Sequence, residues 1–255
     1  MRSYLLNFCS ALLLLIVATN SFAQTLKLNT GNQYPPFSDQ EILNGGIATQ
    51  IVKKVFTQLG YDTQIDFLPW KRGYKRAKEN VYLGTFPWVK NEKRAKDFNF
   101  SRPIITTQAL YFVRKDSAIN AFNQQSLQGK ILCRPIGWNI SPHSQPLIDK
   151  KIIEVFRAPN LENCFKMLAL DRVQIIRSNV HTGWFTIKKL FALTDEFRTL
   201  SETEIETYQL HLLISKSNPD SEQWIARFNK TLDKLEQEGF VQEVVKMHLA
   251  NGYAD

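Results

Sequence analysis

Several common functional signatures are missing from this 255-residue sequence. It has no glycine-rich phosphate loop, no Gly-x-Ser-x-Gly turn and no His-Glu-x-x-His, which excludes the usual motifs of P-loop nucleotide binding, serine esterases and zinc proteases. The four histidines are scattered without metal-ligand spacing, so we expect neither a metal nor a cofactor. Internal repeats and low-complexity segments are also absent. A hydrophobic fraction of 44% and a charged fraction of 22% exclude a disordered or fibrous chain.

The one extended apolar run lies near the N-terminus, where the residues from Ala11 to Val17 are all hydrophobic. A membrane-spanning helix needs roughly 20 such residues, so this run is too short to be an anchor. Met1-Arg2 gives the segment a positively charged start, and Ser21-Phe22-Ala23 is a small-x-small cleavage site. The pattern predicts a signal peptide over residues 1–23, cleaved after Ala23, and therefore an exported protein.

Cysteine is scarce, with three residues in the whole chain. Cys9 belongs to the predicted signal peptide, so the exported chain would keep Cys133 and Cys164. An even pair in an oxidising compartment favours a disulfide. Such a bond would close a loop of roughly 32 residues and stabilise the fold by about 3–4 kcal/mol on the chain-entropy model. Two buried free thiols or a metal-binding pair are the alternatives, and the scattered histidines argue against the metal.

The net charge of +8 raises the question of nucleic acid or membrane partners. The densest basic cluster lies on one expected helix and consists of Lys71, Arg72, Lys75, Arg76 and Lys78. Its spacing places the charges on neighbouring parts of one helix surface, which is typical of a solvated face. Because exported proteins rarely meet DNA, we expect no nucleic acid partner and only a modest attraction for anionic ligands.

Strand and helix patterns alternate along the chain. Strands are expected at residues 25–30, 63–68, 81–86, 108–114, 130–134, 173–176 and 208–214. Helices are expected at residues 47–59, 69–78, 160–170, 180–191 and 240–249, and another is expected to begin at Asn218-Pro219. A polar linker at residues 115–125 separates the two series. This order predicts an α/β protein with two units, each built on a mixed, mostly parallel sheet.

Four segments together resemble a known family. The first part of the chain contains Tyr34-Pro-Pro-Phe37-Ser38 and Leu68-Pro-Trp70-Lys-Arg72, followed by the stretch from Gly84 through Arg94 to Pro103. The fourth segment runs from Tyr208 to Gly239. In this order, over residues 25–250, the chain is similar to the bacterial extracellular solute-binding proteins of family 3, the polar amino-acid receptors of ABC transporters.

The resemblance implies a type II periplasmic-binding-protein fold with two lobes. Lobe 1 would comprise residues 24–110 and 214–255, and lobe 2 would comprise residues 115–208. Two crossings, near Leu110–Lys115 and Thr207–Leu213, would form a hinge. In such a fold the ligand binds in a cleft between the lobes, and closure buries it.

The resemblance assigns Arg94 the position that binds a ligand carboxylate. A guanidinium offers paired donors to two carboxylate oxygens, and each charged hydrogen bond contributes about 1.5–3 kcal/mol. An ordinary solvated surface arginine is the alternative interpretation.

Aromatic and turn residues complete the site that the resemblance implies. Tyr34 and Trp70 match the aromatic walls that hold the body of the ligand, although core packing is the alternative for both. Phe86 and Trp88 lie where the end of a strand meets the ligand, and Trp88 would either line the site or fill it. In lobe 2, Gly137-Trp138 opens a turn whose backbone N–H groups would face the same carboxylate.

Several positions depart from the usual pattern of the family. Asn179 falls near the acidic residue that receives an α-amino group, and an asparagine cannot supply that negative charge. Val89 replaces a common hydroxyl residue, and Leu83 replaces a common aspartate. Arg177 would instead add positive charge to the cleft. These departures argue against a plain α-amino acid and leave an organic acid, a modified amino acid or a short peptide as candidates.

The function implied by the resemblance is binding without catalysis. A periplasmic monomer would capture a small carboxylate-bearing ligand, an amino acid or a related compound, and deliver it to an inner-membrane ABC permease. Two alternatives remain open. An enzyme on the same scaffold, similar to the cyclohexadienyl dehydratases, would need a poised acid that the sequence does not mark. A sensory receptor partner would bind the ligand without transporting it.

Overall fold

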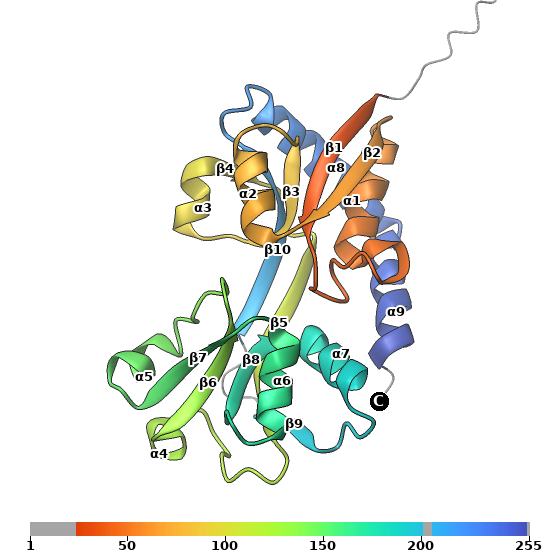
Figure 1. Ribbon diagram of the computed structural model, residues 1–255. Coiled ribbons are helices and arrows are strands. Elements are labelled where there is room, and N and C mark those ends of the chain that lie inside the picture. The colour runs from red at the N-terminus through yellow and green to blue at the C-terminus, as the bar shows by residue number, and fades with distance from the viewer. Residues whose placement is uncertain (1–23, 201–205, 254–255) are drawn as a thin grey trace, which may run out of the picture.

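A computed structural model of the chain describes residues 24–200 and 206–253. The predicted signal peptide, residues 1–23, lies outside the described residues. Figure 1 shows two α/β lobes joined by two long strands, with the C-terminal helices returning to the first lobe. This arrangement confirms the predicted fold class.

Lobe 1 contains a parallel sheet that the return strand extends. Its parallel strands are β1 (Thr25–Gly31), β2 (Asp62–Leu68) and β3 (Gly84–Val89), in the order β2-β1-β3. Strand β10 (Glu206–Ser215) pairs antiparallel with β3 and with the short β4 (Phe98–Phe100). The helical elements of the lobe are η1 (Leu43–Gly45), α1 (Ile47–Gln58), α2 (Trp70–Lys78), α3 (Glu92–Asp97), α8 (Ser221–Gln237) and α9 (Phe240–Tyr253).

Lobe 2 repeats this plan on the other side of the hinge. Strand β6 (Lys130–Pro135) lies parallel between β7 (Ile153–Ala158) and β8 (Ile175–Asn179). Strand β5 (Ile105–Arg114) pairs antiparallel with β8 and with β9 (Phe197–Thr199). The helices are α4 (Gln124–Leu127), α5 (Gln145–Asp149), α6 (Leu161–Ala169) and α7 (Val180–Leu190).

The hinge consists of β5 and β10, which pair with each other where they pass between the lobes. Their register runs from Ile105↔Leu210 to Ala109↔Glu206. Beyond Ala109, β5 pairs with β8 and β9 of lobe 2, so the first crossing lies several residues before the predicted Leu110–Lys115. The second crossing overlaps the predicted segment. The lobe limits given above remain predictions.

Each lobe has its own hydrophobic core. In lobe 1, one face of α1 packs with Leu28, Phe86 and Phe228, which are all fully buried. In lobe 2, Phe112 and Phe165 lie edge to face, with ring centroids 5.5 Å apart. Beside them a disulfide joins Cys133 to Cys164, with Cα atoms 5.6 Å apart, which confirms the predicted bond. This bond ties α6 to β6 inside the core.

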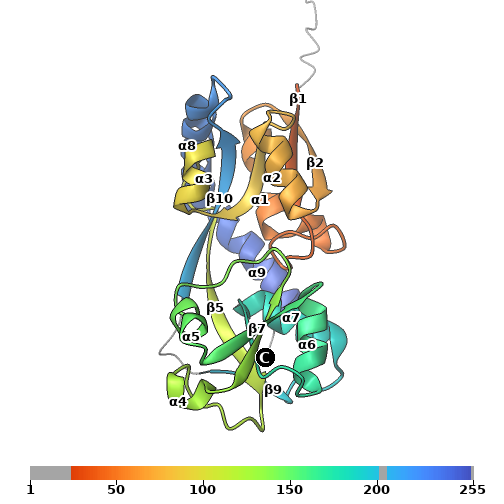
Figure 2. The same ribbon diagram turned by 60° about the vertical axis from the view of Figure 1, so that its left-hand side comes forward.

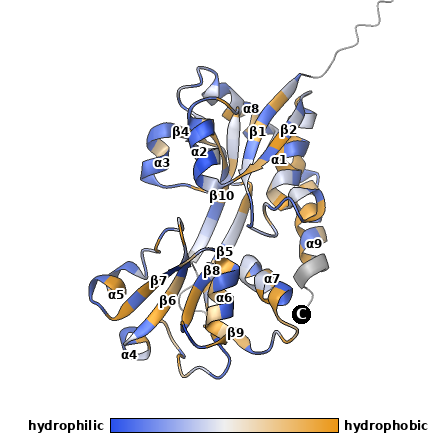
Figure 3. Ribbon diagram, viewed as in Figure 1, coloured by the Kyte–Doolittle hydropathy of each residue, from blue (hydrophilic) through white to orange (hydrophobic). Residues whose placement is uncertain are grey.

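The outer faces of the helices are polar, and no described helix is both long and apolar enough to cross a membrane. Helix α2 is hydrophilic along most of its length (Figure 3). Its buried residues are Gly73 and Ala77, whereas the basic side chains predicted to form a solvated face are exposed. Because these two buried residues are small, α2 can pack closely on the sheet.

The lobes touch along one side, where α7 meets lobe 1. The Thr182 hydroxyl donates a hydrogen bond of 2.6 Å to the carbonyl oxygen of Pro35. The rings of Phe37 and His181 lie 6.3 Å apart. Figure 2 shows the N-terminal loop of lobe 1 and α9 next to α7. These contacts hold α7 of lobe 2 against the loop after β1 of lobe 1.

Candidate ligand-binding site

A row of aromatic side chains lies on lobe 1 and includes three of the predicted site residues. Tyr34 meets the edge of Trp70, with ring centroids 5.9 Å apart, and Trp70 meets Trp88 at 4.9 Å. Tyr74 continues the row from Trp88 at 5.5 Å. All four side chains are half-buried rather than enclosed. The row therefore offers an accessible apolar surface with polar ring edges.

One backbone carbonyl and one side-chain hydroxyl of lobe 1 hold the two indoles in this row. The Trp70 ring N–H donates to the carbonyl oxygen of Asn32 at 3.1 Å, and the Trp88 ring N–H donates to the Thr85 hydroxyl at 3.0 Å. Trp70 also lies directly against Gly31. A Cβ atom at residue 31 would approach the indole to 2.1 Å, so only glycine leaves room for the ring.

Arg94 lies on top of this row. Its guanidinium carbon is 4.6 Å from the centre of the Trp88 ring, a cation–π geometry. One guanidinium N–H donates to the carbonyl oxygen of Val89 at 2.6 Å. Burial lowers the pKa of Arg94. None of the ion pairs between described residues involves Arg94, so its charge is available to a ligand.

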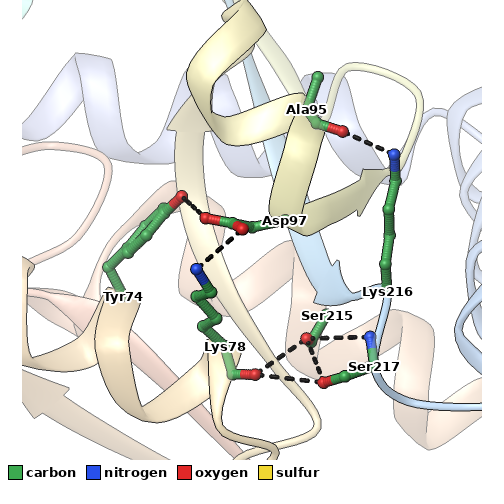
Figure 4. A network of polar contacts seen from close by, with 7 residues as sticks. All are labelled: Tyr74, Lys78, Ala95, Asp97, Ser215, Lys216 and Ser217. Carbon is green, nitrogen blue, oxygen red and sulfur yellow. Dashed lines mark hydrogen bonds and ion pairs between the residues drawn. The ribbon is translucent and has the colours of Figure 1, made fainter.

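A polar network anchors the short helix that carries Arg94 (Figure 4). Asp97 accepts from Lys78 at 2.8 Å and from the Tyr74 hydroxyl at 3.3 Å. The hydrogen bond from Lys78 is the main cause that lowers the pKa of Asp97. At the other end of the helix, Asn91 accepts from the backbone N–H of Arg94 as an N-cap. The nearby carboxylate is therefore committed to α2 and does not pair with Arg94.

Phe86 is placed differently from the other aromatic candidates. Its side chain is fully buried and packs in the core of lobe 1. Its carbonyl oxygen accepts a hydrogen bond of 2.7 Å from the hydroxyl of Thr30. The structure thus puts Phe86 in the core of lobe 1 rather than on the surface of the candidate site.

In lobe 2, Gly137 and Trp138 lie in the turn that follows β6. Figure 1 shows this segment at the edge of lobe 2 nearest lobe 1. Gly137 has a positive φ of +85°, a conformation that favours glycine. The backbone N–H groups of Gly137, Asn139 and Ile140 have no acceptor among the described residues. The N–H group of Trp138, between them, donates to the carbonyl oxygen of Pro135 at 3.1 Å. Free N–H groups close together in a turn suit an anion.

Two arginines hold the carbonyl side of this turn. Arg134 donates to the carbonyl oxygen of Asn139 at 2.6 Å, and its guanidinium lies 5.3 Å from the Trp138 ring. Arg157 donates to the carbonyl oxygen of Trp138 at 2.7 Å. Both arginines therefore bind carbonyl oxygens of the turn, and neither of these hydrogen bonds involves its backbone N–H groups.

Asn179 acts as a helix cap. Its side-chain oxygen accepts from the backbone N–H groups of His181 and Thr182 at the start of α7. Its side-chain nitrogen donates to the hydroxyl of Thr107 in the hinge strand. The amide is buried and its groups are occupied, so it supplies no negative charge to the site.

The sequence interpretation missed Arg134 and gave Arg177 only a possible role. Both are buried, with 6% and 5% of their surface exposed. They follow directly after the register pair Cys133↔Ile176 of two parallel strands. Charged residues at the ends of buried parallel strands are a usable signal, because ligands bind at the carboxyl ends of such strands.

Tyr34 connects the two halves of the site. It lies in the loop after β1, where its backbone N–H donates to Ser38 at 3.0 Å. Burial raises the pKa of its hydroxyl, and the positive charge of Arg177 acts in the opposite direction. The carbonyl oxygen of the next residue, Pro35, accepts the hydrogen bond from Thr182 of lobe 2, while the Tyr34 ring touches Trp70 of lobe 1.

A separate cavity of about 180 Å³ lies on the other side of Phe37, next to the hinge. Its lining is mainly aliphatic, with His181 and Glu236 as its ionisable groups. It has no arginine, so it does not provide the paired donors that a carboxylate needs. Within residues 24–200 and 206–253, no group of three His, Cys, Asp or Glu side chains could hold a metal ion.

Two lobes on a two-strand hinge, with facing donors and aromatic rings, define a ligand-binding protein of the type II periplasmic fold. The sequence profile of the bacterial extracellular solute-binding proteins, family 3, matches residues 26–251. The chain therefore belongs to this family.

Solved structures with the same fold share little sequence with the chain. A mutant of ArgBP from T. maritima is 18% identical, with a TM-score of 0.72, and the match covers 89% of this chain and 95% of that one. AbpA from Streptococcus pneumoniae, bound to L-arginine, is 16% identical over 91% of this chain and 97% of that one, with a TM-score of 0.70.

A third similar structure is a histidine kinase sensor domain with similarity to periplasmic binding proteins. It is 16% identical, with a TM-score of 0.73, over 89% of this chain and 96% of that one. No curated protein sequence matches the chain significantly. At these identities, the solved structures support the fold and leave the ligand open.

Proposed function

We propose that the protein is a periplasmic receptor that captures a small carboxylate-bearing solute between its lobes and delivers it to an inner-membrane ABC permease. The observation that carries this proposal is Arg94, a desolvated guanidinium stacked on Trp88 without an ion pair to any described residue. The signal peptide, cleaved after Ala23, would bring the chain to the periplasm, where it would act as a monomer.

The contributions of the two lobes are complementary in this proposal. Arg94 donates to the ligand carboxylate from lobe 1, and the turn at Gly137-Trp138 adds backbone N–H groups from lobe 2. Trp70 and Tyr34 cover the body of the ligand, and Trp88 supports Arg94 from below. Closure about β5 and β10 then buries the carboxylate, which strengthens each charged hydrogen bond because water is excluded. No step in this cycle breaks a covalent bond of the ligand.

Sensing is the second candidate function, and the similarity to a histidine kinase sensor domain favours it. In this alternative the same closure would be transmitted to a signalling partner rather than to a permease. The binding site would be unchanged, and only the partner would differ.

Binding can be tested with the tryptophans of the site as reporters. Intrinsic fluorescence of the purified protein should change on addition of its ligand, and the ligand should be recovered unaltered by mass spectrometry. Radius of gyration measured by small-angle scattering should decrease at the same ligand concentration. Turnover of the ligand, or closure without binding, would contradict the proposal.

Transport is then tested in cells. Deletion of the gene should abolish uptake of the identified ligand, while the transcriptional response to that ligand is retained. The reverse result, normal uptake with loss of the response, would favour sensing and contradict delivery to a permease.

A further inference from the structure

Positive charge is concentrated on one part of lobe 1. Residues 70–97, which include α2 and α3, contain nine lysines and arginines against three acidic residues, a net charge of +6. The whole chain carries +8, so all its other residues together contribute only +2. Solubility is served by charges of both signs spread over a surface, and it does not explain such a concentration.

Two neighbouring helices present this charge to the solvent. We call six exposed side chains the basic face, four on α2 and two on α3, namely Lys71, Arg72, Lys75, Arg76, Lys93 and Lys96. Lys78 of α2 reaches Asp97 at the end of α3, with 2.8 Å between nitrogen and oxygen, so the two helices lie side by side (Figures 1 and 4). The six charges therefore belong to one region of the surface.

Few acidic groups neutralise the basic face. Glu79 lies 3.8 Å from Lys75, but both side chains are exposed, so this pair contributes little. Asp97 is bound by Lys78 and Tyr74, which are not part of the face. The other five side chains of the face take part in no ion pair between described residues. Their charge is therefore available to a partner.

Helix stability does not account for the charges on α2. Lys71 and Arg72 lie in its first turn, which contains no acidic residue, although the positive end of the helix dipole disfavours cations there. Each of them also stands four residues before another cation, Lys75 or Arg76, and like charges at this spacing destabilise a helix. Positive charge is thus kept on α2 at a cost to the helix, which a binding role explains.

The chemistry of the face favours a layer of phosphate groups over a protein surface. Of the large hydrophobic side chains that are exposed in the described part of the chain, only Val81 lies within residues 70–97. Protein interfaces instead have cores that are depleted of charge and enriched in aromatic anchors. The nine residues of α2 span roughly 13 Å, so the charges also extend further than a small solute. Clustered Lys and Arg side chains on a helix suit anionic headgroups, where each cation adds to binding.

We propose that the basic face of lobe 1 docks on a membrane surface that contains anionic phospholipids. The proposal assumes the export proposed above but not the ligand, because none of the six side chains belongs to the candidate ligand-binding site. Docking through lobe 1 holds the protein beside the permease that receives its solute and leaves lobe 2 able to move about β5 and β10.

Co-sedimentation with phospholipid vesicles tests this docking without any added solute. The probes are vesicles of phosphatidylcholine alone and vesicles of an equimolar mixture of phosphatidylcholine and phosphatidylglycerol. We expect the protein to bind the mixed vesicles only. Binding should weaken steeply as the salt concentration is raised, because salt screens attraction between exposed charges.

A quadruple variant removes the part of the face that lies on α2. It combines Lys71→Gln, Arg72→Gln, Lys75→Gln and Arg76→Gln. Each cation close to an anionic surface strengthens binding by about fivefold, so this variant should bind the mixed vesicles at least about 100-fold more weakly. Its thermal unfolding should be unimpaired, because all four side chains are exposed.

A matched variant controls for net charge. It removes four exposed lysines from other parts of the surface, by Lys53→Gln, Lys150→Gln, Lys166→Gln and Lys230→Gln. The total charge of the two variants is the same. The control variant should bind the mixed vesicles within about fivefold of the unchanged protein, because its substituted residues do not lie on the docking surface.

The outcomes separate this inference from the proposed function. Absence of binding to the mixed vesicles, or equal losses in the two variants, would overturn the docking surface. Binding to the detergent-solubilised permease but not to the vesicles, lost in the α2 variant, would overturn a lipid partner in favour of an acidic protein surface. Solute binding, measured by tryptophan fluorescence, is a separate readout, so its failure would overturn the proposed function and leave the docking surface in place.

Discussion

At the scale of single residues, the candidate site depends on close packing between Trp70 and Gly31. The indole lies where any β-carbon at residue 31 would stand, and its ring N–H is held by Asn32. Trp70 in turn supports Trp88, on which Arg94 is stacked. Adding one methyl group at residue 31 should therefore displace Trp70 and, through Trp88, the guanidinium of Arg94.

Gly31→Ala is expected to displace Trp70 and to weaken ligand binding by about 5- to 160-fold, because overpacking of this size costs roughly 1–3 kcal/mol. The tryptophan emission spectrum of the unliganded protein should shift, since the indole becomes more exposed. Fluorescence titration measures both effects. An unchanged spectrum with unchanged affinity would show that Trp70 is not held against Gly31.

Sequence reasoning identified site residues that belong to local motifs. It missed residues whose partners lie far away along the chain. Arg94, Trp70 and Trp88 belong to local segments with a family pattern. Arg134 has no such segment, because its burial depends on the carbonyl oxygen of Arg177, 43 residues away. Phe86 carries the same family pattern as Trp88, but its side chain packs against Leu28 and Phe228 in the core of lobe 1, which are contacts between segments far apart in the sequence.

At the scale of elements, α7 makes the lobe contact that the structure defines most clearly. The hydroxyl of Thr182 reaches the carbonyl oxygen of Pro35 on the opposite lobe, and Lys189 lies 3.9 Å from Glu41 and 2.9 Å from Glu162. The ion pairs are exposed and contribute little. The buried hydrogen bond is the stronger link between the lobes.

Thr182→Val keeps the shape of the side chain and removes this hydrogen bond. We expect a loss of about 0.5–1.5 kcal/mol from the closed arrangement, and hence roughly two- to twelvefold weaker ligand binding. Calorimetric titration measures the affinity. Thr186→Val is the matched control, because the Thr186 hydroxyl donates within α7, to the carbonyl oxygen of Thr182. Equal effects of the two substitutions would contradict a role of Thr182 in closure.

Elements with a strong periodic pattern were predictable, and elements defined by tertiary contacts were not. The buried face of α1 follows directly from the spacing of Ile47, Ile51 and Val55. Strand β7 escaped prediction because it is a short strand at the end of the sheet with an exposed Phe156. Strand β8 extends beyond the predicted residues 173–176 to Asn179, since its polar end is buried by other elements.

At the scale of the whole molecule, two histidines, His211 and His248, are buried and a third, His181, is half-buried, each in a different place. Burial lowers the pKa of His181, His211 and His248, and it is the largest cause in each case. A histidine whose folded pKa lies below its unfolded value of about 6.5 binds fewer protons in the native state. Stability is then complete above that pH and falls as the pH decreases.

The free energy of unfolding should therefore decrease between about pH 7 and pH 5, measured by urea denaturation at each pH. Asp39 acts in the opposite direction, because burial raises the pKa of its carboxyl, but it is one group against three. His248→Gln should make the decrease shallower. A stability that is constant or rises over this range would contradict the burial of these histidines.

The whole account rests on the claim that Arg94 is the counter-charge of a ligand held between the lobes. The most direct measurement is a calorimetric titration of the solute that stays bound through purification, first into the protein stripped of that solute and then into Arg94→Gln and Arg227→Gln. Arg227→Gln is the matched control, since Arg227 also stacks on a tryptophan of lobe 1, Trp224 at 4.9 Å, but belongs to α8. We predict one site per chain, an affinity at least about tenfold weaker in Arg94→Gln, and no change in Arg227→Gln, because loss of a charged hydrogen bond costs about 1.5–3 kcal/mol. Equal affinity of the unchanged protein and a correctly folded Arg94→Gln would contradict the account.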